Sequence, residues 1–240
     1  MPPLTDRHAL VTGASGAIGS AIAEALADRG ARLLAVGRDS ARLDTLARRL
    51  RGRAPLRALL ADLTDDDAID RIASSALGEF GGVDVLIHAA GEYASGPLET
   101  SPVEAFDRQL RVNARAPYLL TQRLLQSLLA RKGEIVFVNS SAVIAPRAGI
   151  GAYAASKAAL RALAESLRAE VNARGVRVLS VFPGRTASSM QEQVHRAEGT
   201  AYRSEKLLQP ADVAAAIVNA LALPRTAEVT DLYLRPMQAP

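Results

Sequence analysis

The chain has 240 residues, of which 49% are hydrophobic and 22% are charged, as expected for a globular protein with a substantial core. The net charge is only +4 and the basic residues are scattered, which favours solvated helix faces over a nucleic-acid-binding surface. Cysteine is absent, which excludes disulfides, thiol nucleophiles and thiolate metal sites. Histidines and carboxylates show no metal-ligand spacing, so we predict no metal.

No signal-peptide pattern occupies residues 1–10, and no apolar stretch reaches the ~18 residues of a membrane span. We therefore expect a cytoplasmic protein with no membrane partner.

Short apolar runs alternate with helical patterns along the chain. The runs predict strands at residues 8–11, 32–36, 56–60, 83–89, 134–138, 176–182 and 228–234, and helices begin near residues 17, 40, 65, 102, 114, 152 and 210. The runs near 83–89 and 134–138 lack strict alternation, as parallel strands buried on both faces do. The pattern predicts an α/β fold: one Rossmann-type, doubly wound parallel sheet of about seven strands, in a single domain over residues 1–240.

Residues 187–209 carry few periodic apolar side chains. They predict a long irregular insert, which in a compact domain is often a binding lid, so we expect a substrate lid here.

A glycine-rich turn joins the first predicted strand to the first helix. Gly13, Gly16 and Gly19 permit a tight turn and close backbone approach, and the helix N-terminus offers free N–H groups to a pyrophosphate. The strand before the turn and the helix after it favour a dinucleotide site over a plain strand–helix connection.

The second predicted strand ends in Ala35-Val36-Gly37-Arg38, without the acidic residue that usually binds the ribose hydroxyls of NAD. A guanidinium suits a 2′-phosphate, because it is planar and permanently charged. We therefore expect NADP(H) rather than NAD(H); the alternative is a solvated arginine at a strand end.

Tyr153 and Lys157 are four residues apart, on one face of a predicted helix. A nearby ammonium favours the phenolate, so we expect the tyrosine pKa to fall from its usual ~10 toward neutrality. Such a tyrosine could donate or accept a proton in catalysis.

Several motifs occur in a fixed order around this pair. Ser140 lies 13 positions before Tyr153, Asn113 opens Asn-Ala-Arg-Ala-Pro, Pro183-Gly184 follows the sixth predicted strand, and Asp62 ends the third. This order resembles the compact branch of the short-chain dehydrogenase/reductase family over essentially the whole chain.

The resemblance implies that Tyr153 donates a proton to a carbonyl oxygen during reduction and that Ser140 hydrogen-bonds this oxygen. It also implies that Lys157 binds the nicotinamide ribose and lowers the tyrosine pKa, while Asn113 holds a water that relays protons. The residues expected at the cofactor are Gly13, Ser15, Gly16, Ala17, Ile18, Gly19, Arg38, Asp62, Leu63, Ala89, Ala90, Gly91, Tyr153, Lys157, Pro183, Gly184, Thr186 and Ser188.

Two motifs depart from the family pattern. The turn has its middle glycine at Gly16 and alanine at Ala17, where the compact branch usually has glycine; the extended branch, which includes sugar-nucleotide epimerases, shares this spacing but needs a larger C-terminal region. His88-Ala89-Ala90-Gly91 replaces Asn-Asn-Ala-Gly, which removes two amide side chains. We expect His88 to be a core histidine rather than a catalytic base, and His8 to be structural or on the surface. His195 is expected to occupy a solvated helix position, with a substrate contact as the alternative.

By resemblance, the substrate pocket is expected to be walled by residues 92–95, 142–145 and the insert from 187. The apolar middle segment favours an apolar or lightly polar small-molecule carbonyl. Alternatives are a 3-oxoacyl-thioester reductase, an enzyme that retains its cofactor during another reaction, and a non-catalytic NADP-binding regulatory protein on the same fold. Family members usually form oligomers, so we expect a homodimer or homotetramer built on the helices after Asn113 and around Tyr153.

Overall fold

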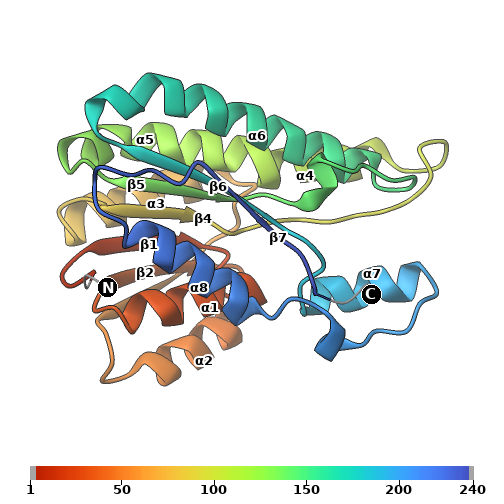
Figure 1. The fold of residues 1–240 in the computed structure, drawn as a ribbon, viewed down its shortest axis with the longest axis horizontal. Helices are drawn as coiled ribbons and strands as arrows, with labels where there is room; N and C mark the ends of the chain where they lie inside the picture. The colour runs from red at the N-terminus through yellow and green to blue at the C-terminus, as the bar shows by residue number, and fades with distance from the viewer. Residues whose placement is uncertain (1–3, 238–240) are drawn as a thin grey trace.

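The computed structural model describes residues 4–237; the remainder of the predicted 1–240 domain lies outside the described residues. All strands join one parallel sheet in the order β3-β2-β1-β4-β5-β6-β7 (Figure 1). The strands are β1 (His8–Thr12), β2 (Arg32–Gly37), β3 (Leu56–Leu60), β4 (Val85–His88), β5 (Glu134–Val138), β6 (Arg177–Pro183) and β7 (Asp231–Leu234). The predicted seven-stranded α/β sheet is confirmed.

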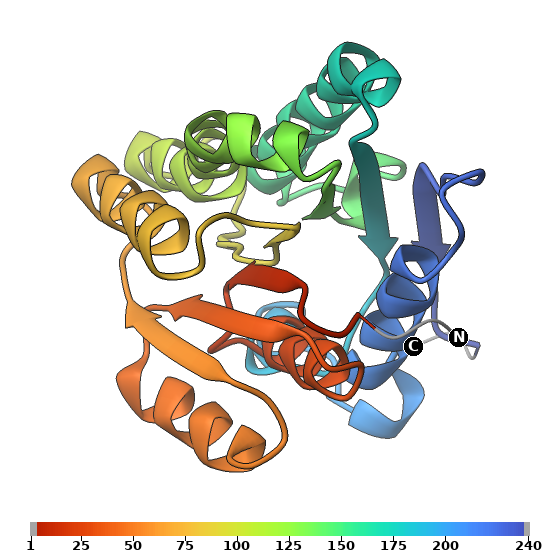
Figure 2. The same cartoon turned by 90° about the vertical axis from the view of Figure 1, so that its left-hand side faces the viewer.

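Helices cover both faces of the sheet (Figure 2). One face packs against α1 (Ala17–Ala27), α2 (Ser40–Leu50) and α8 (Pro210–Leu221), and the other against α3 (Asp66–Glu79), α5 (Ala116–Ala130) and α6 (Gly151–Val171). The short α4 (Val103–Leu110) packs beside α6, and α7 (Ser189–Ala197) lies apart from both layers at one end of the molecule (Figure 1).

The core is mostly aliphatic, because aromatic residues make up only 4% of the chain. Every residue of β4 and β5 is buried, which confirms that these strands are covered on both faces, whereas the edge strands β3 and β7 are partly exposed. A fully buried Leu or Phe contributes about 1.5–3 kcal/mol, so Phe137, Phe182 and the surrounding leucines fix the sheet firmly between its helices.

The strand order indicates where on the sheet a ligand is expected to bind. The chain crosses from the β3 side of the sheet to β4, so the crevice between the carboxyl ends of β1 and β4 is the topological switch point, where ligands of such sheets bind. The glycine-rich turn at residues 13–19 follows β1, and residues 89–93 follow β4, so both segments meet at this point.

The prediction of an irregular segment at 187–209 is wrong in its first half, which contains helix α7. Ser188 caps this helix by accepting a hydrogen bond from the Gln191 amide (3.1 Å). Only Val194 and His195 are buried along it. Because so few side chains face the protein, the helix leaves almost no apolar periodicity in the sequence.

Candidate active site

The glycine turn is packed too tightly for side chains at two positions. Gly13 has φ +70°, and a Cβ there would lie 2.5 Å from the Ala90 nitrogen; a Cβ at Gly19 would lie 2.2 Å from the Gly13 carbonyl oxygen. No side chain caps α1, whose N-cap is Gly16. The uncapped N-terminus therefore has backbone N–H groups available for an anion.

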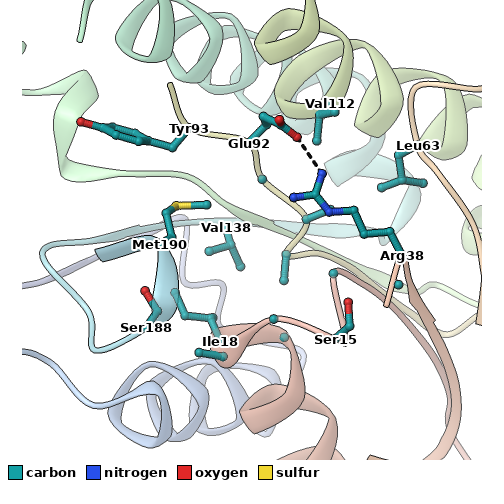
Figure 3. Close-up of a pocket in the computed structure, with 18 of the residues that line it drawn as sticks. Ser15, Ile18, Arg38, Leu63, Glu92, Tyr93, Val112, Val138, Ser188 and Met190 are labelled. Atoms are coloured by element: carbon teal, nitrogen blue, oxygen red, sulfur yellow. Dashed lines mark hydrogen bonds and ion pairs between the residues drawn. The ribbon is translucent and has the colours of Figure 1, made fainter. Parts of the chain in front are cut away.

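A cavity of about 540 Å³ lies above this turn, at the carboxyl ends of β1, β2, β3, β4 and β5 (Figure 3). Fifteen of the predicted cofactor residues line it: Gly13, Ser15, Gly16, Ala17, Ile18, Gly19, Arg38, Asp62, Leu63, Ala89, Ala90, Gly91, Tyr153, Lys157 and Ser188. Its size is that of a small-molecule or cofactor site.

The other three predicted cofactor residues are not part of the cavity wall. Pro183 ends β6, the Gly184 amide donates to the Leu234 carbonyl (2.8 Å), and the buried Thr186 hydroxyl donates to the Gly184 carbonyl (3.0 Å). The segment after β6 thus satisfies its own polar groups and joins β6 to the α7 region.

Lys157 lies on α6 and is 3% exposed. Its Nζ donates to the Val138 carbonyl at the end of β5 (3.0 Å) and lies 6.0 Å from the centre of the Tyr153 ring. A Cβ at Gly91 would lie 3.7 Å from the same Nζ. Burial lowers the pKa of Lys157 to about 8.

Tyr153 occupies the same helix face, with its ring edge-to-face against Tyr93 at 5.0 Å between centroids. Burial raises the pKa of Tyr153, and the hydrogen bond with the Ser140 hydroxyl only partly offsets this. The expectation of a lowered pKa is therefore wrong for the protein alone. The Lys157 ammonium donates to a backbone carbonyl. Desolvation of the Tyr153 phenol raises its pKa by more than the hydrogen bond with Ser140 lowers it.

Ser140 is held by a residue that the sequence reasoning did not single out. This residue is Asn139. Its side-chain Oδ1 accepts from the Ser140 amide (2.9 Å), and its Nδ2 donates to the Lys157 backbone carbonyl (3.1 Å). Asn139 is buried and lines the cavity. A polar residue at the end of the apolar β5 run was the available signal, since buried amides are usually hydrogen-bonded.

Asn113 lies in a π-helical turn, Arg111–Arg115, between α4 and α5. Its Oδ1 accepts from the Glu92 amide (2.8 Å), and its Nδ2 donates to the Glu92 carbonyl and to the Ser156 hydroxyl (both 2.9 Å). The side chain thus fastens the segment after β4 to α6. Such π-turns occur frequently at functional sites; the water relay through Asn113 stays a prediction.

The histidines have structural surroundings. His88 stacks on Phe137 (5.0 Å between centroids), its Nε2 lies 2.9 Å from the Thr121 hydroxyl, and burial lowers its pKa to about 3, which confirms a core histidine. The partly buried His8 lies 3.3 Å from the Gly82 carbonyl. The expectation of a solvated position is wrong for His195, which is 4% exposed and contacts the Gln191 carbonyl (2.9 Å).

The far end of the cavity is charged. Asp62 accepts from the Thr64 amide and hydroxyl (both 2.8 Å), and these bonds lower the pKa of Asp62. Arg38, at the end of β2, forms an ion pair with Glu92 (2.9 Å), as Figure 3 shows.

The predicted substrate walls are only partly reproduced. Glu92 and Tyr93 line this cavity, and so does Met190 from the predicted insert; all three are labelled in Figure 3. Residues 142–145 do not line it, and Ile144 is 53% exposed. The lining residues missed by sequence reasoning are Val36, Gly37, Asp39, Arg42, Ala61, Val112, Val138 and Asn139. Those beside quoted motifs, such as Asp39, could have been found by extending each motif by one residue.

Within residues 4–237, no group of three or more histidines and carboxylates is arranged to hold a metal ion. The same part of the chain contains no helix that is both long and apolar enough to span a bilayer.

Comparison with known proteins agrees with this geometry. The family model described as short chain dehydrogenase matches residues 7–199. An uncharacterized oxidoreductase of Staphylococcus epidermidis, SERP2049, is 32% identical over 99% of this chain and all of that protein.

Two similar solved structures contain coenzymes. An alcohol dehydrogenase from the archaeon Thermococcus sibiricus, complexed with 5-hydroxy-NADP, is 28% identical with a TM-score of 0.88, covering 98% of both chains. A metagenomic short-chain oxidoreductase in complex with NADP is 31% identical with a TM-score of 0.85, covering 98% of this chain and 99% of that one. The chain belongs to the short-chain dehydrogenase/reductase family and is an oxidoreductase of CH–OH groups that uses a nicotinamide cofactor.

Proposed function

We propose that this protein is an NADP(H)-dependent oxidoreductase that interconverts a small-molecule carbonyl and a secondary alcohol, with Tyr153 as the acid or base. One observation carries the proposal: Arg38 and the Tyr153–Lys157 pair line the same cavity. The similar proteins whose solved structures contain NADP or an NADP derivative support it.

The cavity fits a dinucleotide. The cradle of Gly13 and Gly19 leaves no room for Cβ atoms, which suits close approach of a pyrophosphate to the N-terminus of α1. Asp62 and Leu63 would hold the adenine end, Arg38 the 2′-phosphate, and Lys157 the nicotinamide ribose. The bound nicotinamide would supply or accept the hydride, and the protein supplies orientation and electrostatics.

We assign proton transfer to Tyr153, assisted by Lys157 on the same helix, α6. The raised pKa keeps Tyr153 protonated at neutral pH, the state needed to donate a proton to a carbonyl oxygen. The Ser140 hydroxyl, which interacts with Tyr153 in the protein alone, would turn to donate its single proton to that oxygen as negative charge develops. Lys157, with a pKa of about 8, is mostly charged at pH 7 and would favour the phenolate once the proton has left.

The substrate side of the cavity is partly apolar. Tyr93 packs edge-to-face against Tyr153, and both Tyr93 and Met190 line the cavity. Met190 belongs to the segment 187–209 that we propose as a lid. These surroundings favour an apolar or lightly polar carbonyl compound. Residues 1–240 would form one domain for both cofactor and substrate.

We also propose a homodimer or homotetramer formed through α4, α5 and α6. Val103, Phe106 and Tyr118 are exposed on α4 and α5. Along α6, Ala155, Ala158 and other small residues are exposed, which would allow a second helix pair to approach closely. Sedimentation velocity checks this: a monomeric mass at micromolar concentration would contradict it.

The function is tested by following NADPH and NADH consumption in parallel against diketones, aryl ketones, aldehydes, sugars and 3-oxoacyl thioesters. We expect turnover of at least one class with NADPH as the better coenzyme. Arg38→Ala should raise the KM for NADPH much more than that for NADH. Tight NADPH binding without turnover of any class would contradict the proposal, and equal effects of Arg38→Ala on both coenzymes would remove the NADP(H) assignment.

A further inference from the structure

Glu92 is fixed at its backbone by the catalytic region. Its amide donates to Asn113 Oδ1 (2.8 Å) and its carbonyl accepts from Asn113 Nδ2 (2.9 Å). Asn113 is itself fully buried and bonded to Ser156 on α6. These bonds hold the backbone of Glu92 in place, although the residue lies in a segment without regular structure.

The Glu92 carboxylate is held between two guanidinium groups. Oε2 accepts from Arg38 Nη1 at 2.9 Å, and Oε1 accepts from Arg108 Nε at 2.8 Å. The side chain of Glu92 is 20% exposed, whereas that of Arg38 is 62% exposed. The carboxylate is thus the anchored partner, and Arg38 is the partner that is free to turn.

The pair crosses the cavity that we assign to the coenzyme. Arg38 follows β2 and Glu92 follows β4, both line the cavity, and their side chains point toward each other (Figure 3). A guanidinium binds a carboxylate and a phosphate through the same planar donors. Arg38 Nη1 is already bonded to Glu92 Oε2, so a phosphate that needs this donor competes with Glu92 for it, and the two anions also repel each other.

We propose that Glu92 is a specificity-determining residue that competes with the coenzyme 2′-phosphate for Arg38. This inference rests on the proposed NADP(H) function. Glu92 lowers the affinity for NADPH, because binding must detach Arg38 from it. It scarcely affects NADH, because a coenzyme without the phosphate leaves the ion pair in place. Arg108 keeps the carboxylate in position in both cases.

The test measures dissociation constants of NADPH and NADH by fluorescence titration of the whole protein. Glu92→Gln removes the charge but keeps the size and an acceptor for Arg108. We expect NADPH to bind about threefold to tenfold more tightly to this variant, and NADH to change by less than about twofold, since an exposed ion pair and a nearby like charge have effects of this size.

Two further variants test whether the effect of Glu92→Gln depends on Arg38 and on the position of the removed charge. In the Arg38→Ala background, Glu92→Gln should change NADPH affinity by less than about twofold, because the competition for Arg38 is gone and only the repulsion between the two anions remains. Glu99→Gln, which removes one charge from an exposed residue outside the cavity, should leave both constants unchanged.

Glu92→Asp, which withdraws the carboxylate from Arg38 but keeps its charge, is the second variant and should tighten NADPH binding to a smaller extent. Thermal melts identify any variant that fails to fold.

The proposal is overturned if Glu92→Gln weakens NADPH binding, changes both coenzymes equally, or acts just as strongly without Arg38. The underlying NADP(H) assignment fails by a different result: Arg38→Ala alone would then affect NADPH and NADH to the same extent.

Discussion

Charged residues have opposite surroundings at the two ends of the strands, which we call the amino edge and the carboxyl edge of the sheet. At the amino edge, Glu134 at the start of β5 is 1% exposed and is bound by Arg7 (3.1 Å) and Arg177 (2.8 Å to Nε). Arg177 also donates to backbone carbonyls at the end of α8, including that of Leu221 (3.0 Å). At the carboxyl edge, the buried Lys157 donates to a backbone carbonyl rather than to a carboxylate.

This difference separates stability from chemistry. A buried carboxylate with two guanidinium partners has its charge balanced within the protein, so its role is to hold elements together. A buried ammonium beside a cavity has no such carboxylate to balance its charge, so its charge can interact with a molecule bound in the cavity. Substitutions at the two edges should therefore produce different losses.

The largest effect is expected at the carboxyl edge. Tyr153→Phe should lower kcat/KM about 10³-fold, because it removes the transferable proton, while the melting temperature and the NADPH dissociation constant stay near wild type. Steady-state kinetics, thermal melts and coenzyme titration check this. Tyr93→Phe, which keeps the neighbouring ring, is the matched control. Activity within about tenfold of wild type would contradict the acid/base role.

The opposite pattern is expected at the amino edge. Glu134→Gln should lower the free energy of unfolding by about 3 kcal/mol, because two guanidinium groups lose a buried partner, while kcat/KM at 25 °C changes little. Urea denaturation measures the loss. Glu165→Gln, which breaks an exposed pair with Arg161, should cost at most about 0.5 kcal/mol. A similar loss in both variants would show that the buried cluster has no special role.

An intermediate effect, visible only in acid, is expected at His88. Its pKa is about 3 in the folded protein and near 6.5 when unfolded, so the unfolded state binds the proton first as the pH falls. Stability is full above pH 6.5 and decreases toward pH 3. At pH 5 the wild type should have lost about 2 kcal/mol through this residue.

His88→Asn removes the titrating group and keeps hydrogen-bonding capacity toward Thr121. Urea denaturation at pH 7.5 and pH 5.0 should therefore show a smaller acid loss in this variant. Equal losses in the two proteins would mean that the acid sensitivity comes from other groups.

The smallest effect is expected in the segment proposed as a lid. Glu198, just after α7, pairs with Arg185 (2.7 Å) and with Arg147 (3.2 Å) in the loop before α6. Because both pairs are partly exposed, Glu198→Gln should raise the substrate KM about twofold and leave stability nearly unchanged. Glu205→Gln, within the same segment, is the control. An unchanged KM would argue against a role for these pairs in substrate binding.

The sequence by itself determined the alternation of strands and helices, and it located the Tyr153–Lys157 pair that we propose as catalytic. Apolar runs and glycines act locally, so they predict β1, the turn at Gly13 and helix α1 without any knowledge of the rest of the chain. The spacing of Tyr153 and Lys157 is likewise fixed by the helix that carries them.

Tertiary structure alone decided how these groups interact. The pairing of Arg38 with Glu92 joins residues 54 positions apart, and the hydrogen bonds of Asn139 join β5 to α6. The raised pKa of Tyr153, the burial of His195 and the small buried face of α7 all depend on neighbours from distant segments. Burial and long-range ion pairs are set by packing, and packing has no local signature in the sequence.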